Sequence, residues 1–592
     1  MDNGAIKLQK YAGMWRNKSQ RHKNKAEKLG LTLSWSSLSV YLVKKSTSFL
    51  KTKITTKKLV NNVTGVAKAG TLTAVMGASG AGKTTLLSAL AQRNNGGLVV
   101  EGDVRVNGKA IGSKIRKISA FLYQKDMFTP TLTVYEHLVF YARLKLDRRL
   151  SKAEVNDKVF EILRQVGLLN VAHRQIGTSG DHFQQMATDH QKTIICAIHQ
   201  PSSEILDIFD SIVIMAESRT AFIGNAKETI QFLKTQGYEC PMNYNPADFF
   251  IKILAVTPDD EQNSHKRIKR ICDAYVSSDS AQSMDGFIHD ELTNYSAPKL
   301  NLADFKPTNW LTRFLLLTFR LEVDIFRNRS YLSFRLIQKL LVGLMMGSLY
   351  SGSITKDQPG IQALEGFFFS LAIQNVVSPV FSCVNKFQKQ FPLFLREYED
   401  GLVSSLQFYT AMCLAWFPIT VLESLLVTAP FYILAGAYIS LGIFVDTLYV
   451  TSITAVLSLL CGMSFSAIID SYEICTFVLG ELLNLTNITA GFYMSLRTVP
   501  IYLKLFETIS WQRSLMELLS IFHIQGSTVF SCTNSTGLEL PCLSTGEQVL
   551  DQYGYSTSNF TRDFVSIYLL MVVFYLLGYV FFWRRMVKLT AV

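Results

Sequence analysis

The chain has 592 residues, 48% of them hydrophobic, and a formal net charge of +13. That length exceeds one domain and predicts at least two folding units. The basic residues concentrate at 7–28, 313–335 and 584–588, a distribution that we attribute to membrane topology. We therefore expect a lipid membrane as a partner and no nucleic acid.

The first half of the chain has an α/β pattern. Residues 1–30 are polar and basic, lack the apolar core of a signal peptide, and are expected to form a cytosolic tail. From residue 31 to 256, short β-rich runs alternate with helical stretches, which predicts a nucleotide-binding α/β domain. Strands are expected at 72–76, 118–123, 193–198 and 211–216.

A connecting region is expected at 257–330. Residues 257–307 are polar, with charge runs that indicate a linker or solvated helices. Residues 310–329 place apolar side chains at helical spacing among four arginines, which predicts an amphipathic helix at the membrane surface.

The last part, 331–592, predicts an all-α transmembrane domain. About 20 helical residues cross a hydrocarbon core of ~30 Å, and six apolar runs are long enough. Six crossings return the chain to its starting side, so both termini are expected in the cytosol. The predicted spans are 332–350, 363–384, 409–436, 439–469, 474–494 and 564–583.

The segment between the last two spans, about 497–562, is expected to be an external loop. Cys532 and Cys542 bracket a polar stretch, and a disulfide between them would place the loop in an oxidising space. Asn534 and Asn559 begin glycosylation sequons in the same loop and agree weakly with that side.

Two carboxylates fall inside predicted spans, where charge is costly. Glu423 and Glu481 are each open to two interpretations. One is a polar contact in the helix bundle or along a substrate route. The other is a helix end that lies closer to water than the hydropathy pattern suggests.

A phosphate-binding loop is the strongest local signal. Residues 77–84 read GASGAGKT, the full G-x-x-x-x-G-K-[ST] pattern, between an expected strand and a helix-forming run. Its glycines let backbone N–H groups turn toward phosphate, its lysine supplies charge, and its hydroxyl can ligate Mg²⁺. The predicted ATP-binding residues are Gly77, Ala78, Ser79, Gly80, Ala81, Gly82, Lys83, Thr84 and Thr85.

Longer segments carry a family resemblance. They read GTLTAVMGASGAGKTTLLSALAQR, YQKDMFTPTLTVYEHL, TIICAIHQPSSEILDIFDSIVIMAE and GYECPMNYNPADFF. Together they resemble the G subfamily of ATP-binding-cassette half-transporters, and within it the white, scarlet and brown group of insect eye-pigment precursor transporters. The resemblance covers the chain from residue 31 onward.

The resemblance implies roles for several residues. Gln124 matches the Q-loop glutamine, a ligand of Mg²⁺ and a link to the membrane domain, and His199 matches the switch histidine that contacts the γ-phosphate. Tyr41 or Trp35 is a candidate for stacking on adenine, although a strand-core role is favoured for both. The resemblance further implies ATP and Mg²⁺ as cofactors and a second, white-like half-transporter as heterodimer partner.

Two elements of the family are missing between Gln124 and His199. The signature of the LSGGE type and the Walker B strand ending in Asp-Glu do not occur, and FQQMATDHQKT stands in their place. The fold expected is therefore a truncated α/β P-loop domain followed by a six-helix transmembrane domain. Asp181 and Asp189 are polar-flanked and do not replace the lost carboxylates.

The function expected from the resemblance is movement of small aromatic pigment precursors, of tryptophan or kynurenine type, across a plasma or pigment-granule membrane. The missing elements leave hydrolysis open. The chain is a spliced or wrongly assembled product of a normal transporter gene, an inert subunit beside a working partner, or a null allele. In the alternative, it is a hydrolysis-deficient partner that binds nucleotide without catalysis.

Overall fold

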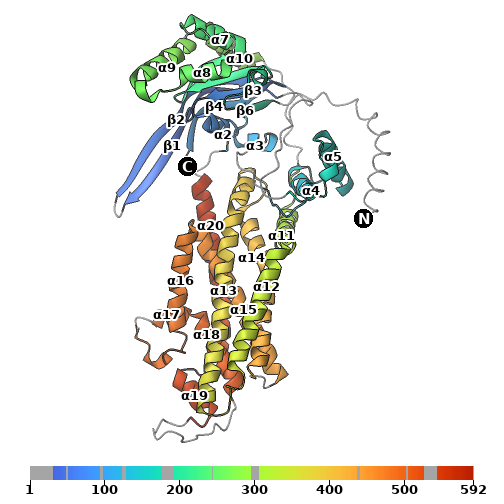
Figure 1. The fold of residues 1–592 in the computed structure, drawn as a ribbon, viewed down its shortest axis with the longest axis vertical. Helices are drawn as coiled ribbons and strands as arrows, with labels where there is room; N and C mark the ends of the chain where they lie inside the picture. Colours follow the sequence, from blue (N-terminus) through green and yellow to red (C-terminus); the bar gives the residue numbers. More distant parts are fainter. Residues whose placement is uncertain are drawn as a thin grey trace. The chain divides into compact units, whose positions relative to one another are not determined.

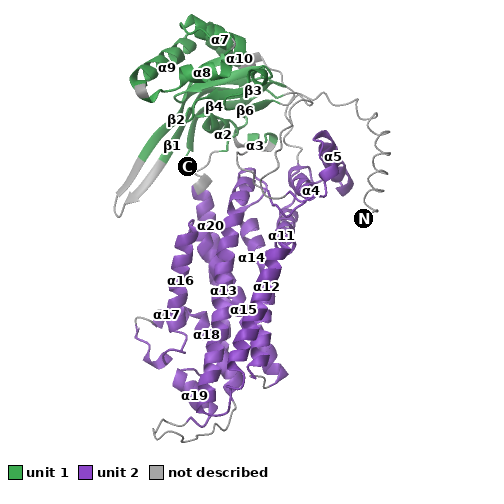
Figure 2. Cartoon of the chain, viewed as in Figure 1, with its two compact units in different colours: residues 1–122, 183–300, 592 green, residues 123–182, 301–591 purple. Residues whose placement is uncertain are grey.

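The structure is a computed structural model that describes residues 31–48, 51–93, 98–122, 128–176, 193–242, 244–294, 306–436, 440–501, 504–525 and 543–590. The chain forms two compact units (Figure 2). Unit 1 comprises residues 1–122 and 183–300, and unit 2 comprises residues 123–182 and 301–591. Each is described below by itself.

Unit 1 contains two four-stranded sheets (Figure 1). The first is antiparallel, in the order β2-β1-β4-β5, and the second has the order β6-β3-β7-β8. In the second sheet β3 lies parallel to both β6 and β7, and β8 returns antiparallel to β7. The strands are β1 (Leu33–Ser48), β2 (Lys51–Ala67), β3 (Leu72–Gly77), β4 (Leu98–Val106), β5 (Lys109–Ala110), β6 (Ile194–Ala197), β7 (Ser211–Ala216) and β8 (Arg219–Gly224).

The second sheet is buried on both faces, because alternate side chains of a strand point to opposite sides. Val75 of β3 packs in one core with Trp35 and Leu86, while Met76 packs in another with Phe250. Such strands are apolar throughout rather than alternating, which is why 72–76 and 211–216 stood out in the sequence. The strand predictions at 72–76, 193–198 and 211–216 are confirmed.

The strand expected at 118–123 is wrong within its described part. Residues Ile115–Ile118 form the short helix α3, and residues 119–122 have no regular structure. A strand needs a hydrogen-bonded neighbour. None of the described strands pairs with this segment, and Leu122 is 95% exposed.

Helices cover unit 1, and the polar segment after residue 257 is among them. Helix α9 buries Ile268, Ile271 and Cys272 while its basic residues face outward, so of the two interpretations solvated helices are correct. The helices are α2 (Lys83–Leu90), α6 (Ser203–Leu206), α7 (Ala226–Thr235), α8 (Pro246–Leu254), α9 (Glu261–Val276) and α10 (Asp279–Asn294).

Unit 2 is helical (Figure 1). Apolar helices run side by side in a bundle, the short α4 lies beside α11, and α5 packs against α4 (Figure 1). The helices are α4 (Val134–Lys145), α5 (Lys152–Gln165), α11 (Trp310–Arg327), α12 (Arg329–Tyr350), α13 (Gln358–Glu399), α14 (Ser405–Leu434), α15 (Leu441–Ile468), α16 (Tyr472–Ile488), α17 (Lys504–Ile509), α18 (Trp511–Ile524), α19 (Gly546–Tyr553) and α20 (Phe560–Thr590).

Five helices of the described chain are long and apolar enough to cross a membrane, and they correspond to five of the six predicted spans: α12, α13, α14, α15 and α20. The run predicted at 474–494 is α16, which has 17 residues and spans about 26 Å at 1.5 Å per residue. It packs against α13 and α15. Its membrane crossing, and the count of six, stay predictions.

Candidate nucleotide-binding site

The phosphate-binding loop follows β3 and leads into α2. Gly82 caps the helix in the left-handed region, at φ 95°, and a Cβ there would lie 2.6 Å from the carbonyl oxygen of Leu59. A Cβ on Gly77 would lie 2.2 Å from the carbonyl oxygen of Met215. Both positions therefore require glycine, for sterics as well as for backbone conformation.

Lys83 closes the loop from the first turn of α2. Its Nζ donates to the carbonyl oxygens of Gly77 and Ala78, at 2.7 and 2.9 Å, and partial burial lowers its pKa. No side chain caps the helix, so its first N–H groups and the positive end of its dipole are available to an anion. The Thr84 side chain is exposed beside them. These residues fit the triphosphate of ATP, with Thr84 as a Mg²⁺ ligand.

His199 lies at the same end of the sheet as the loop. β6 runs parallel to β3 with Ala197 opposite Val75, and the N–H of Ile198 donates to the Val75 carbonyl at 3.1 Å. The carboxyl ends of the two strands are therefore adjacent, where open α/β sheets bind ligands. His199 is exposed, and Gln200 after it takes a φ of +46°, which is uncommon for a residue with a side chain.

The segment NPADF supports the loop that follows His199, a role that sequence reasoning did not assign. Asn245 caps α8 and its Nδ2 donates to the carbonyl oxygen of Pro201 at 2.9 Å. Asp248 accepts from the same amide nitrogen at 3.2 Å. The signal was present in the sequence as an Asn-Pro pair, which is typical of an N-cap followed by Pro at the first helical position.

Several predicted site residues lie outside the described residues: Gln124, Cys532, Cys542, Asn534 and the stretch that replaces the signature and Walker B elements. Of the two candidates for adenine stacking, Trp35 is 1% exposed within the core, and Tyr41 is half-buried with Lys58 Nζ 5.3 Å from its ring centre. In the described part of the sheet β6 has β3 as its one neighbour, and its side chains are half-buried or exposed. Among the described strands none pairs with the other edge of β6, where a further strand could add.

A buried polar cluster joins α4 to the membrane helices. Tyr141 of α4 donates to Glu397 of α13 at 2.6 Å, and Arg320 of α11 donates to the same carboxylate at 3.1 Å through Nη2. Arg396 donates to the Tyr141 oxygen at 3.0 Å. Arg320 and Glu397 are 3% and 0% exposed, so the pair is buried from water. We call these four residues the coupling cluster.

A second set of contacts lies at the start of α4. Glu136 caps its own helix through the Thr133 N–H and receives a hydrogen bond from Arg327 at 2.8 Å. The Arg327 bond lowers the pKa of Glu136 to about 2. Thr131 donates to Asp324 of α11 at 2.7 Å. The Glu136–Arg327 and Thr131–Asp324 bonds join residues almost 200 positions apart, which no local pattern predicts.

His137 lies beside the coupling cluster and is 9% exposed. Burial, followed by the positive charges of Arg320 and Arg396, lowers its pKa to about 3. Its ring packs on Tyr141 at 4.7 Å between centres. The packed histidine is therefore neutral at physiological pH.

The two intramembrane carboxylates differ in surroundings. Glu423 is 3% exposed and accepts from Arg335 of α12 at 2.7 Å, so the bundle-contact interpretation fits it. Glu481 is exposed on α16, and both of its interpretations stay open. Asn559, a predicted sequon residue, donates to the buried carboxylate of Glu517 at 2.7 Å.

Comparison with known proteins agrees with this architecture. Residues 60–201 match the ABC transporter family, and residues 312–522 and 199–282 match families described as ABC-2 type transporter. A nucleotide-binding cassette joined to an apolar helical bundle defines an ABC transporter subunit, which is an integral membrane protein that binds nucleotide.

Among similar proteins, scarlet of Drosophila melanogaster is 32% identical over 95% of this chain and 90% of its own length. White of the same species is 30% identical over 88% and 82%, and wht-3 of Caenorhabditis elegans is 27% identical over 93% of each. The chain therefore belongs to the G subfamily of ABC half-transporters. The segments LDRRLSKAEV and STGEQVLDQYGYS favour scarlet in that subfamily, in agreement with these identities.

The alignment with scarlet spans 615 positions, more than the 592 residues of this chain. Some scarlet residues therefore have no counterpart here. The alignment length does not place those residues, so the loss of several dozen family residues between Gln124 and His199 stays a prediction.

Proposed function

We propose that the chain is one half of a heterodimeric transporter that moves small aromatic pigment precursors, of tryptophan or kynurenine type, with a white-like half as partner. Similarity to scarlet and white supports this substrate class and partner. We further propose six crossings with both termini in the cytosol, and a plasma or pigment-granule membrane. The cassette geometry carries the proposal, because a complete phosphate loop lies beside His199.

The residues of this chain have separate roles in that function. Lys83 and the first turn of α2 bind the β- and γ-phosphates, and Thr84 holds Mg²⁺ together with phosphate oxygens. Gln124 completes the Mg²⁺ ligands, and His199 contacts the γ-phosphate. The coupling cluster transmits movement of α4 to α11 and α13, because it is the buried polar contact between them.

Photo-crosslinking with an ATP analogue tests the site in the heterodimer. Wild-type chain should be labelled, and Lys83→Ala should not, while Lys252→Ala, which changes an exposed lysine on α8, keeps the label. Transport of a labelled kynurenine into vesicles tests the substrate. Labelling without transport above the partner alone would reject an active transporter half.

A second function is favoured by one observation, the open edge of β6. A strand that ends in carboxylates would normally pair there and position the attacking water, so its loss favours a partner that binds nucleotide without hydrolysis. In that case His199→Ala leaves heterodimer ATPase unchanged, whereas a working site loses most of its turnover. The transcript across codons 177–190 then shows whether an exon has been skipped.

A further inference from the structure

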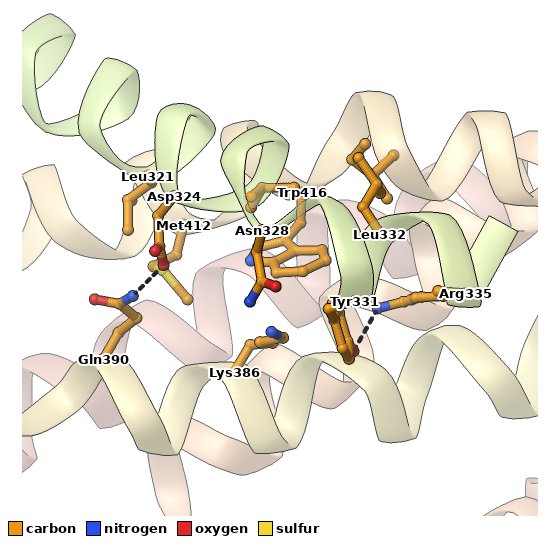
Figure 3. A pocket seen from close by; sticks show the side chains of 12 residues that line it. Leu321, Asp324, Asn328, Tyr331, Leu332, Arg335, Lys386, Gln390, Met412 and Trp416 are labelled. Carbon is orange, nitrogen blue, oxygen red and sulfur yellow. Dashed lines mark hydrogen bonds between the residues drawn. The ribbon is translucent and has the colours of Figure 1, made fainter. Parts of the chain in front are cut away.

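Two further polar regions lie in unit 2. One is a small cavity at the corner where α11 meets α12, lined by Asp324 and Lys386 among others (Figure 3). Its volume is about 30 Å³, room for water rather than for a ligand, and the charges of these two side chains offset each other. The other is a set of hydrogen bonds that converge on Glu517 of α18. It involves the first residue of a glycosylation sequon.

Four donors surround the carboxylate of Glu517, whose side chain is 0% exposed. Its Oε1 accepts from the side-chain amide of Asn559 at 2.7 Å and from the N–H of Ser556 at 2.9 Å. Its Oε2 accepts from Arg513 at 2.7 Å and from Arg562 at 3.2 Å. Each oxygen therefore has two donors, which satisfies a buried charge. We call these five residues the Glu517 hub.

The Glu517 hub fastens the start of α20 to α18. Asn559 lies in the short turn that directly precedes α20. Four residues to either side, Tyr555 and Asp563 are 3% and 0% exposed, so the chain around Asn559 is anchored in both directions. Phe560 adds a ring contact with Phe522 of α18, at 5.9 Å between centres. The Asn559 side chain would therefore turn outward only by releasing its neighbours.

Asn559 begins the sequon Asn-Phe-Thr, and its side-chain nitrogen is the atom that would carry the sugar. That nitrogen is the atom that lies 2.7 Å from Oε1 of Glu517. A sugar replaces one of its two hydrogens and needs open space beside it. Asn559 is half-buried and its amide faces a carboxylate with no exposure, so the folded protein does not offer that space.

The distance to the membrane favours the same conclusion. Residues 557–588 form one candidate span, and its apolar run begins near Phe564. Five residues of helix rise about 8 Å, so Asn559 lies close to the lipid surface. Sugars are added to chain that extends into the aqueous space away from that surface. In the sequence, Asn534 stands 30 residues before the same apolar run (564 − 534) and is free of this restriction.

We propose that Asn559 is a structural residue that clamps the start of α20 to α18 and carries no sugar. Its amide supplies one of the two bonds to Oε1 of Glu517, and a sugar on that nitrogen would break the Glu517 hub. Of the two sequons predicted in the external loop, Asn534 is then left as the modification site. The clamp does not depend on the proposed topology or substrate.

Hydrogen exchange of the full chain in detergent tests the clamp, without ATP, a partner or transport. The amides of residues 564–567 are measured, because they are the first that bond within α20. Asn559→Ala should speed their exchange about tenfold or more, since a hydrogen bond to a buried charge is lost, while the other membrane helices exchange as before. Thr561→Ala is the matched control, because it destroys the same sequon at an exposed position and should exchange as wild type does.

The mass of the full chain made in animal cells tests the sugar. Wild type and Thr561→Ala should lose the same mass when an amidase removes N-linked sugars, and the result does not require Asn559→Ala to fold. A sugar that is present in wild type or in Asn534→Gln, and that Thr561→Ala removes, would overturn the proposal. Equal exchange in Asn559→Ala and wild type, or an equal rise in Thr561→Ala, would reject the clamp.

Discussion

Glu397→Gln tests the coupling cluster directly. The substitution keeps the shape of the side chain but leaves Arg320, which is 3% exposed, without its buried counter-charge. Removing one partner of a buried ion pair costs about 3–5 kcal/mol, because the other charge stays desolvated. Tyr141 also loses a charged acceptor. Arg320 stands over the ring of Phe140, so the loss should be felt along α4.

Hydrogen exchange of the α4 amides measures this cost. At 1.36 kcal/mol per factor of ten, 3 kcal/mol lowers protection about 100-fold if α4 opens by leaving the cluster. Glu322→Gln on α11 is the control, because among the described residues Glu322 forms no ion pair. Replacing Arg320 and Glu397 together by leucine should recover part of the loss, since no charge then stays buried alone.

Protection that falls less than tenfold in Glu397→Gln, or equally in Glu322→Gln, would refute the reasoning. It would mean that water enters the cluster and screens Arg320. Loss of protection confined to α13 would show that Glu397 stabilises its own helix and does not hold α4.

Three further predictions concern other parts of the chain. His137 has a lowered pKa, so the docking of α4 should be strongest above pH 6.5 and should weaken as the pH falls toward 3, by about 2 kcal/mol between pH 7 and 5. Hydrogen exchange of the α4 amides at these two pH values measures the change, and His137→Phe should abolish it. Gly82→Ala should abolish ATP-analogue labelling, since its Cβ would meet the Leu59 carbonyl, whereas Ser79→Ala should keep it. Glu423→Gln should leave Arg335 unpaired and so lower the yield of folded protein on size-exclusion chromatography. Adding Arg335→Leu to the same chain should restore part of that yield. An unchanged elution profile in Glu423→Gln would contradict a structural role for the pair.

The sequence was most informative where the chemistry is local. The phosphate loop needs glycines, a lysine and a helix start within eight residues, and the structure has that order. Spans such as α15 follow from one long apolar run. The apolar run at 118–123 gave the wrong answer because a strand depends on pairing with a neighbour, which the run itself does not reveal, and no described strand pairs with it.

Contacts between distant positions could not be predicted. Tyr141 and Glu397 are 256 residues apart, and nothing in either segment indicates the other.

The chain passes from unit 2 back to unit 1 between Ile176 and Thr193, within the interval where the sequence shows neither a signature nor a Walker B pattern. The apolar cores of both units are formed by residues outside that interval. Among the described residues β6 pairs along one edge, and an unpaired strand edge is a surface to which another chain can add. We therefore expect the covering of that edge to affect how much of the protein escapes cellular quality control.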